Sequence, residues 1–232
     1  MCGRYVLYGP RSRLIEQFDC GGFDEINPLP RDLTLFNIAT TQTAPLIRAG
    51  PDGVRALTLA RWGRVPSWVK EWGKRSEPIN AKVETAGEKP MFRHAFRKSR
   101  VLVRQAASPN GNRSQATSRG YKQPFYIHPV GAPLFAFGGL LEHWDGPDGP
   151  VLTFAIRTTA ANEWMAPLHD RMPVIVLPED YDAWLDPGVT EPGLVRELAA
   201  AYPSERMEAY PVGRAVDKPR AQGPGLIERV VR

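Results

Sequence analysis

The spacing of apolar residues predicts short β-strands along much of the chain. Strands are typically rich in Val, Leu, Phe and Tyr and are bounded by Gly, Pro, Asp or Asn. Five segments fit this description, namely residues 54–62, 100–105, 123–130, 133–144 and 150–158. The last two are joined by Asp145-Gly146-Pro147-Asp148-Gly149, which predicts a tight hairpin turn.

Helical spacing of apolar residues is found in four short segments. Residues 11–19 place Leu14, Ile15 and Phe18 on one helical face and stop at a Cys-Gly-Gly sequence. The other predicted helices are residues 161–168, 179–185 and 191–202. No repeat and no long linker divides the chain. We therefore expect an α+β fold in a single domain over residues 1–232, mostly antiparallel β curled into a barrel-like sheet with flanking short helices.

One polar segment interrupts this pattern. Residues 104–120 are rich in Ser, Asn, Gln, Arg and Gly and lack large apolar side chains, which predicts a mobile loop. They lie within a longer stretch, residues 89–141, that contains nine Lys and Arg but no Asp or Glu. One interpretation is a solvated basic face. The other is an electrostatic track for the phosphate backbone of a nucleic acid.

Composition and charge narrow the class of protein. Apolar residues make up 42% of the chain and charged residues 24%, as in soluble globular proteins. The net charge of +5 and the pI of about 9.4 favour polyanionic partners. Two cysteines cannot form a disulfide framework, so a reducing cytoplasm is expected. No metal site, cofactor, signal peptide or membrane span is predicted.

Cys2 is the first candidate for covalent chemistry. Initiator methionine is normally removed when the second residue is small. Removal of Met1 would expose an α-amine with a pKa of about 7.7–8.0 and a thiol with a pKa of about 8.5. A neighbouring cation such as Arg4 favours the thiolate. Such an aminothiol condenses with an aldehyde to a Schiff base, and the thiol then closes a thiazolidine ring. Taken alone, a cysteine at this position is more often an ordinary N-terminal residue.

Several short motifs follow one another in a fixed order. They are Met1-Cys2-Gly3-Arg4-Tyr5, Phe36-Asn37-Ile38-Ala39-Thr40-Thr41-Gln42, Arg61-Trp62-Gly63-Arg64-Val65-Pro66-Ser67-Trp68, Ile79-Asn80-Ala81-Lys82-Val83-Glu84-Thr85, Glu88-Lys89-Pro90-Met91-Phe92-Arg93, Phe135-Ala136-Phe137-Gly138-Gly139-Leu140 and Leu168-His169-Asp170-Arg171-Met172-Pro173-Val174. In this order and spacing they resemble the SOS response-associated peptidase family of abasic-site-processing proteins. The resemblance extends from residue 1 to roughly residue 215.

The resemblance implies a barrel-like α+β domain with a basic groove for single-stranded DNA. In that family the mature N-terminal cysteine forms a thiazolidine with the ring-opened sugar aldehyde of an abasic site. Removal of the initiator methionine, by self-processing or by an aminopeptidase, gives the family its peptidase name, and a lyase step is an associated activity. We accordingly expect a cytoplasmic monomer that joins the nucleoid when it is bound to DNA.

The resemblance also assigns roles to individual residues. It makes Cys2 the nucleophile, Asn80 the holder of the reacting sugar, and Thr158 a further site residue. His169 would move protons at the ring oxygen, because the ordinary histidine pKa of about 6.5 suits that work. Tryptophans of the family stack or wedge against bases, arginines bind phosphates, and an asparagine borders the site in a loop. The DNA-binding set implied for this chain is Arg4, Asn37, Trp62, Trp68, Lys82 and Arg93.

Structural roles compete with these assignments. The alternatives are a core histidine for His169, core aromatics for Trp62 and Trp68, a turn for Asn80, and pairing of Arg93 with Glu84 or Glu88.

The sequence also departs from the family pattern. Counting residues from the strand at 100–103, Asn110 occupies the position of a family glutamate that assists proton transfer. Asparagine cannot donate or accept a proton in this role. Lys82 replaces an arginine and therefore loses its planar, bidentate fork. Thr40 replaces a customary proline.

Three functions follow from these observations. The first is an enzyme that crosslinks to abasic sites in single-stranded DNA through Cys2. The second is an impaired member of the family that binds single-stranded DNA non-covalently. The third is a thiol peptidase that uses Cys2 with His169, for which no sequence feature supplies an oxyanion hole.

Overall fold

The computed structural model describes residues 3–23, 34–50, 53–73, 77–106, 114–118, 121–132 and 134–230 of the 232-residue chain. Cys2 and Asn110 lie outside these residues. The strands are β1 (Arg4–Leu7), β2 (Cys20–Phe23), β3 (Leu35–Ala39), β4 (Thr43–Ala49), β5 (Arg55–Trp62), β6 (Asn80–Lys82), β7 (Arg100–Ala106), β8 (Ser114–Ser118), β9 (Tyr121–Pro129), β10 (Leu134–Gly146), β11 (Gly149–Ala160), β12 (Arg171–Pro173), β13 (Ile175–Val176) and β14 (Met207–Pro211).

The helices are short and lie outside the sheet. They are α1 (Arg11–Phe18), α2 (Val83–Ala86), α3 (Pro90–Lys98), α4 (Tyr181–Leu185) and α5 (Pro192–Glu197). Single 3-10 turns occur at η1 (Pro178–Asp180), η2 (Ser204–Arg206), η3 (Arg214–Asp217) and η4 (Pro224–Ile227). None of the helices in the described ranges combines the length and the apolar character needed to cross a membrane.

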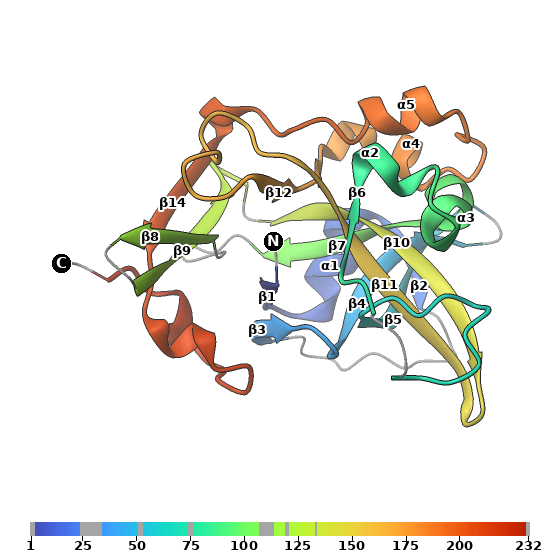
Figure 1. Cartoon of the computed structure of the whole chain (residues 1–232), viewed down its shortest axis with the longest axis horizontal. Coiled ribbons are helices and arrows are strands. Elements are labelled where there is room, and N and C mark those ends of the chain that lie inside the picture. Colours follow the sequence, from blue (N-terminus) through green and yellow to red (C-terminus); the bar gives the residue numbers. More distant parts are fainter. Residues whose placement is uncertain are drawn as a thin grey trace.

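Five strands close into a barrel. Their order is β11-β10-β7-β4-β5, and each of these neighbouring pairs is antiparallel. The ring closes because β5 also pairs with β11, in parallel, where Arg61 lies opposite Thr153 and Trp62 lies opposite Phe154. The expected α+β fold with a barrel-like, mostly antiparallel sheet is therefore confirmed. Figure 1 shows this barrel on one side of the molecule, with α2 to α5 above it.

Aromatic side chains fill the barrel. The Tyr5 ring lies 5.3 Å from the Trp62 ring and 6.5 Å from the Phe137 ring, both edge-on, and Trp62 stacks on Phe154 at 6.2 Å. Gly138 leaves room for Trp184 of α4, since a Cβ at Gly138 would lie 2.4 Å from that ring. β10 thus packs against the barrel core on one face and against the helical layer on the other.

A smaller sheet, β14-β9-β8, lies beside the barrel, and the β1–β3 pair lies between them (Figure 1). Side chains of β1 alternate between the two layers: Tyr5 and Leu7 belong to the barrel core, and Val6 belongs to a second cluster. That cluster joins Val6 to the small sheet and to the last described residues of the chain, with Tyr126, Tyr210, Val212, Val216, Leu226 and Ile227 as its other buried members. Consequently β1 is covered on both faces.

Most elements expected from the sequence are present. The strands expected at 54–62, 100–105, 123–130, 133–144 and 150–158 correspond to β5, β7, β9, β10 and β11. The hairpin turn is confirmed, because Gly146 pairs with Gly149 across it. The helices expected at 11–19 and 179–185 correspond to α1 and to η1 followed by α4.

Three expectations were wrong. Residues 161–168 form turns instead of a helix, because the backbone hydrogen bonds of helical spacing, from Ala166 to Asn162 and from His169 to Met165, are not consecutive. The helix expected at 191–202 is only the six-residue α5. Residues 104–120 are not simply a loop: β7 continues to Ala106, and β8 pairs with β9 from Ser114 to Ser118.

The acid-free stretch also differs from a uniform basic surface. Arg100 and Arg104 are 3% and 1% exposed. Arg100 donates hydrogen bonds to the carbonyls of Phe96, Arg97, Trp184 and Asp186, and it thereby joins the ends of α3 and α4. Burial lowers the pKa of Arg104 to about 9. Neither guanidinium is available to a surface ligand, whereas Arg93, Arg97 and Lys98 of α3 are exposed.

Candidate active site

A parallel strand pair assembles the central residues of the candidate site. β6 runs beside β11, with Asn80 opposite Ile156 and Lys82 opposite Thr158. Paired and alternate residues share a face of the sheet, so Asn80, Lys82 and Thr158 lie on the same face as Ile156. Ile156 belongs to the barrel core. The three polar residues therefore lie where the inner face of the barrel reaches the end of β11.

Arg171 of β12 ties this group to its surroundings. Its guanidinium donates two hydrogen bonds to Glu84 of α2, at 2.6 and 3.0 Å. It also donates to the backbone carbonyl of Thr158 and lies 3.3 Å from the Thr158 hydroxyl. Thr158 is 3% exposed. Arg171 thus holds the start of α2 against the end of β11.

His169 lies two residues before Arg171 and is half-buried. Its Nδ1 accepts a hydrogen bond from the Arg171 backbone N–H at 2.9 Å and lies 2.5 Å from Asp170 Oδ1. The N–H contact favours a bare Nδ1, whereas the carboxylate favours a protonated one. Nδ1 of His169 thus faces both a hydrogen-bond donor and a carboxylate acceptor. A wholly buried core histidine does not fit this placement.

Glu84 and Arg171 form an ion pair beside Asn80, Lys82 and Thr158. The hydrogen bonds from Arg171 lower the pKa of Glu84, with a further contribution from the charges of Arg171 and Lys82. Glu84 therefore remains an anion beside Arg171, while Lys82 is exposed. The alternative pairing of Arg93 with Glu84 or Glu88 is not found: among the described residues, Glu84 pairs with Arg171 and Glu88 with Arg196.

Two residues of the expected DNA-binding set are buried elsewhere. Trp62 is 0% exposed, packs inside the barrel and donates from Nε1 to the Ile79 carbonyl at 2.9 Å. Asn37 is 1% exposed and lies within β3 and not in a loop bordering the site. Neither side chain presents a free surface to a nucleotide in this conformation. Trp62 is therefore a core aromatic, which was the structural alternative to a DNA-binding role.

Trp68 and Arg93 lie on the surface. Trp68 is 54% exposed, and Arg93 is an exposed residue of α3. Their two segments are joined by the buried Arg64, which donates to the Met91 carbonyl and to Glu142 and lies over the Phe92 ring. An exposed indole and an exposed guanidinium can stack on bases and bind phosphate, respectively.

Arg4 begins β1 and pairs with Ala39 of β3. Its Nη1 donates to the Gly3 carbonyl at 2.8 Å. Cys2 lies two residues before Arg4, outside the described residues. In the described ranges, no group of three or more His, Cys, Asp or Glu side chains could hold a metal ion.

The sequence motifs contained two site residues that were not singled out. Arg171 and Glu84 connect the motif at 168–174 with the motif at 79–85 through their two hydrogen bonds. The sequence signal for this contact is that the two charges are opposite. Arg171 and Glu84 lie 87 positions apart, so no local pattern indicates that they are in contact.

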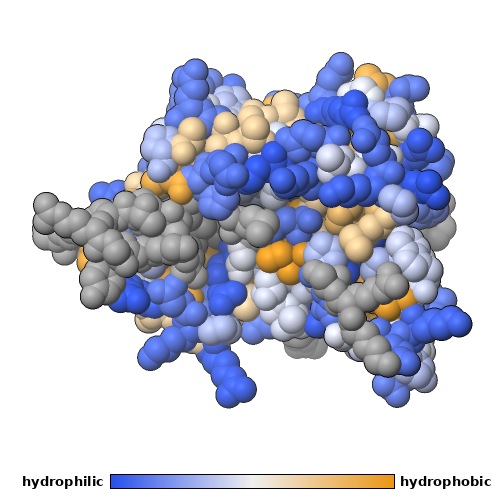
Figure 2. All heavy atoms as spheres, in the orientation of Figure 1, coloured by the Kyte–Doolittle hydropathy of each residue, from blue (hydrophilic) through white to orange (hydrophobic). Residues whose placement is uncertain are grey.

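The class of protein is therefore a small closed barrel with a group of polar side chains at one end. Figure 2 shows a mostly hydrophilic face over it. Residues 1–219 match the family described as SOS response associated peptidase (SRAP). The chain belongs to this family, which confirms the resemblance inferred from the motifs.

Relatives of the chain carry a consistent description. "Abasic site processing protein YoqW" of Bacillus subtilis is 36% identical over 230 residues, covering 98% of this chain and 99% of that protein. "Abasic site processing protein YedK" of Escherichia coli is 29% identical over 236 residues, covering 99% and 100%. A solved structure from Bacteroides thetaiotaomicron has a TM-score of 0.83 at 22% identity, covering 99% of this chain and all of that one, and it shares the fold.

Proposed function

We propose that the chain processes abasic sites by forming a covalent bond between Cys2 and the sugar of the lesion in single-stranded DNA. Removal of Met1 would free the amine. The amine attacks the aldehyde carbon of the ring-opened sugar and releases one water as the Schiff base forms. The thiol sulfur then adds to the same carbon, its proton passes to nitrogen, and a thiazolidine results.

One observation supports the proposal: β6 pairs with β11 so that Asn80 and Thr158 share a face at the end of the barrel, and His169 comes two residues before β12, which pairs with the same end of β11. These are the residues expected to hold the sugar and to move protons. Membership of the family, and the names of relatives such as YoqW, support a DNA-processing role. A self-processing peptidase step and a lyase step remain parts of the same proposal.

Each residue has a proposed role. Asn80 orients the sugar through its amide, and His169 exchanges a proton with the ring oxygen as the sugar opens. Thr158 is a positioned hydroxyl beside them. Arg4, Lys82 and Arg93 bind phosphates, and Trp68 stacks against a base. We no longer include Asn37 and Trp62, because both are buried away from this group.

A denaturing gel tests the covalent step. Protein whose intact mass shows loss of Met1 is mixed with single-stranded DNA containing one abasic site, and a slower band is expected. Cys2→Ala should give no such band, because Cys20, the other cysteine, is 5% exposed. Trimmed wild-type protein that gives no shifted band would contradict the proposal.

A non-covalent DNA-binding role is the second candidate. It is favoured by Asn110 at the position of the family glutamate, which removes a proton-transfer group that typically contributes about 10²–10⁴-fold. Binding of abasic DNA that is salt-sensitive, survives Cys2→Ala and yields no covalent product would select this candidate.

A further inference from the structure

The last described residues of the chain lie against the strand that follows Cys2. Residues 212–230, named here the clamp segment, contribute Val212, Val216, Leu226 and Ile227 to the cluster that covers Val6. The segment is joined to β14 by the Tyr210 hydroxyl, which donates to the Ile227 carbonyl at 3.1 Å, and to β9 by the Val212 N–H, which donates to the Pro124 carbonyl at 3.0 Å. The family match ends at residue 219, so half of this segment lies beyond it.

Asn37 and Gln222 fasten the clamp segment to β3. The Asn37 amide nitrogen lies 2.9 Å from the Lys218 carbonyl and 3.3 Å from those of Val216 and Ala221. Gln222 accepts a hydrogen bond from the Phe36 N–H at 2.8 Å and donates to the Asn37 carbonyl at 3.3 Å. The side-chain amide of Gln222 thus acts on β3 as a neighbouring peptide group would.

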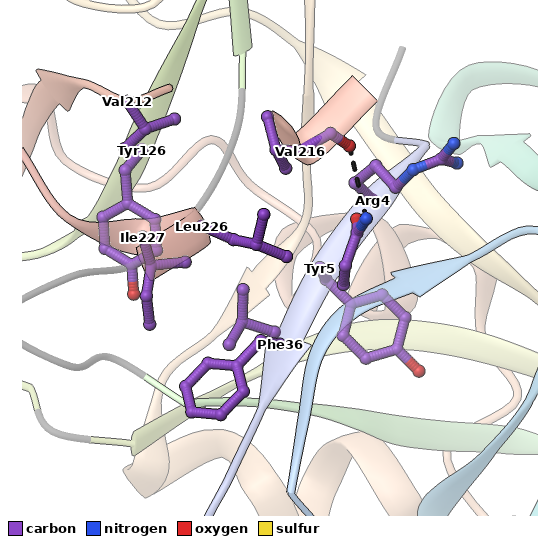
Figure 3. A pocket seen from close by; sticks show the side chains of 10 residues that line it. Arg4, Tyr5, Phe36, Tyr126, Val212, Val216, Leu226 and Ile227 are labelled. Atoms are coloured by element: carbon purple, nitrogen blue, oxygen red, sulfur yellow. Dashed lines mark hydrogen bonds between the residues drawn. The ribbon is translucent and has the colours of Figure 1, made fainter. Parts of the chain in front are cut away.

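β3 transmits this attachment directly to β1. Arg4 pairs with Ala39 and Tyr5 with Ile38, and no other strand pairs with β1 among the described residues. Figure 3 shows Leu226 between Val216 and Phe36, with the Tyr5 ring on the other side of β1. The hollow that remains here is about 10 Å³, room for roughly one water molecule, so the layers are closely packed.

We propose that the clamp segment is a positioning element for the N-terminal nucleophile, acting through Asn37 and Gln222 on β3 and through β3 on β1. The proposal rests on the function proposed above. Position matters because a displacement of about 1 Å at a reacting group can lower a rate about 10²-fold. In the described part of the chain β1 pairs with β3, so the register of β1 follows the position of β3.

Gln222→Ala tests this inference in the full-length chain. Gln222 is exposed, so its loss removes two hydrogen bonds and leaves the core intact. Hydrogen exchange of the peptide containing residues 3–8 should become about 10-fold faster, since β3 loses two hydrogen bonds that hold it and, through it, β1. The rate of crosslink formation with abasic DNA should fall about 10-fold, while the Kd for that DNA stays within two-fold of wild type. Glu228→Ala, an exposed change in the same segment, should alter neither quantity.

The outcomes separate the two proposals. Unchanged exchange in Gln222→Ala overturns the clamp, whatever the DNA chemistry. Faster exchange with an unchanged crosslinking rate overturns the positioning role. A parallel increase in the Kd for abasic DNA would mean that the segment binds DNA and does not position the nucleophile. Wild-type protein that forms no crosslink overturns the proposed function, and the exchange measurement still decides whether the clamp holds β1.

Discussion

Trp62 and Trp68 occupy opposite environments although they lie in one eight-residue motif. Trp62 is enclosed by Tyr5 and Phe154, whereas Trp68 is 54% exposed. A glycine with φ of 129° follows Trp62 and turns the chain out of the barrel. Sequence alone could not separate their roles, because a core indole and a base-stacking indole have the same local pattern.

The two tryptophans should respond oppositely to truncation. Trp62→Ala should lower the free energy of unfolding by roughly 3–5 kcal/mol, as expected for a buried aromatic. Trp68→Ala should change it by less than about 1 kcal/mol and weaken binding of single-stranded DNA about 10-fold through lost stacking. Denaturant titration and a binding isotherm on both variants check this. Equal losses of stability would contradict it.

Cys20 gives a pH-dependent contribution to stability. Burial raises the pKa of its thiol from 9.0 to about 11. Below pH 9 the thiol is neutral in both folded and unfolded chains, so its contribution is fully present. As the pH rises from 9 to 11 the unfolded chain ionises first, and up to about 3 kcal/mol of stability is lost.

The corresponding measurement is the denaturant midpoint of wild type and Cys20→Ala at intervals from pH 8 to pH 11. Both proteins contain the other titrating groups, so the difference between them isolates this thiol. Wild type should lose stability more steeply above pH 9. Parallel curves would show that Cys20 ionises equally in both states.

At the scale of elements, long strands were predictable and short ones were not. β10 and β11 have 13 and 12 residues, with runs of apolar residues and a Pro-Asp turn between them. β6 and β12 have three residues each and carry no usable pattern. Yet β6 brings Asn80 beside β11, so the site depends on a pairing that sequence spacing could not reveal. The family resemblance indicated Asn80 and Thr158 as site residues, and the β6–β11 pairing explains why they share one face of the sheet.

Arg64 and Glu142 join three elements through a buried ion pair. Their side chains are 1% and 10% exposed. Burial lowers the pKa of Arg64 and raises that of Glu142, in both cases the largest effect, so desolvation opposes both charges more than the pair favours them. The pair therefore fixes the position of the Trp68 segment without adding much stability.

Because desolvation opposes both charges, the effects of replacing Arg64 and Glu142 on the free energy of unfolding should not be additive. Arg64→Met and Glu142→Leu should each lower the free energy of unfolding by roughly 3–5 kcal/mol, because each leaves one buried charge unpaired. The double variant should be more stable than either single one. Chemical denaturation of the four proteins gives the coupling energy, and simple additivity would refute this view of the pair.

The whole molecule carries a net charge of +5, and α3 presents the exposed cations Arg93, Arg97 and Lys98 of the acid-free stretch. Affinity for single-stranded DNA should fall with salt, with a slope of about −0.7 in log K against log salt for each phosphate contacted. Arg93→Ala should reduce that slope by about 0.7. Arg13→Ala, an exposed change on α1, serves as the control. An unchanged slope in Arg93→Ala would remove α3 from the DNA path.

The double coverage of β1 has a consequence for the order of events during synthesis. The first strand made is held by residues 212–230, which are made last, about 200 residues later. At about 5–20 residues per second, the beginning of the chain stays loose for roughly 10–40 s. We therefore expect removal of Met1 to be easiest on the nascent chain, so that the timing of translation, and not only the chemistry of the finished fold, decides how much of the protein acquires a free Cys2.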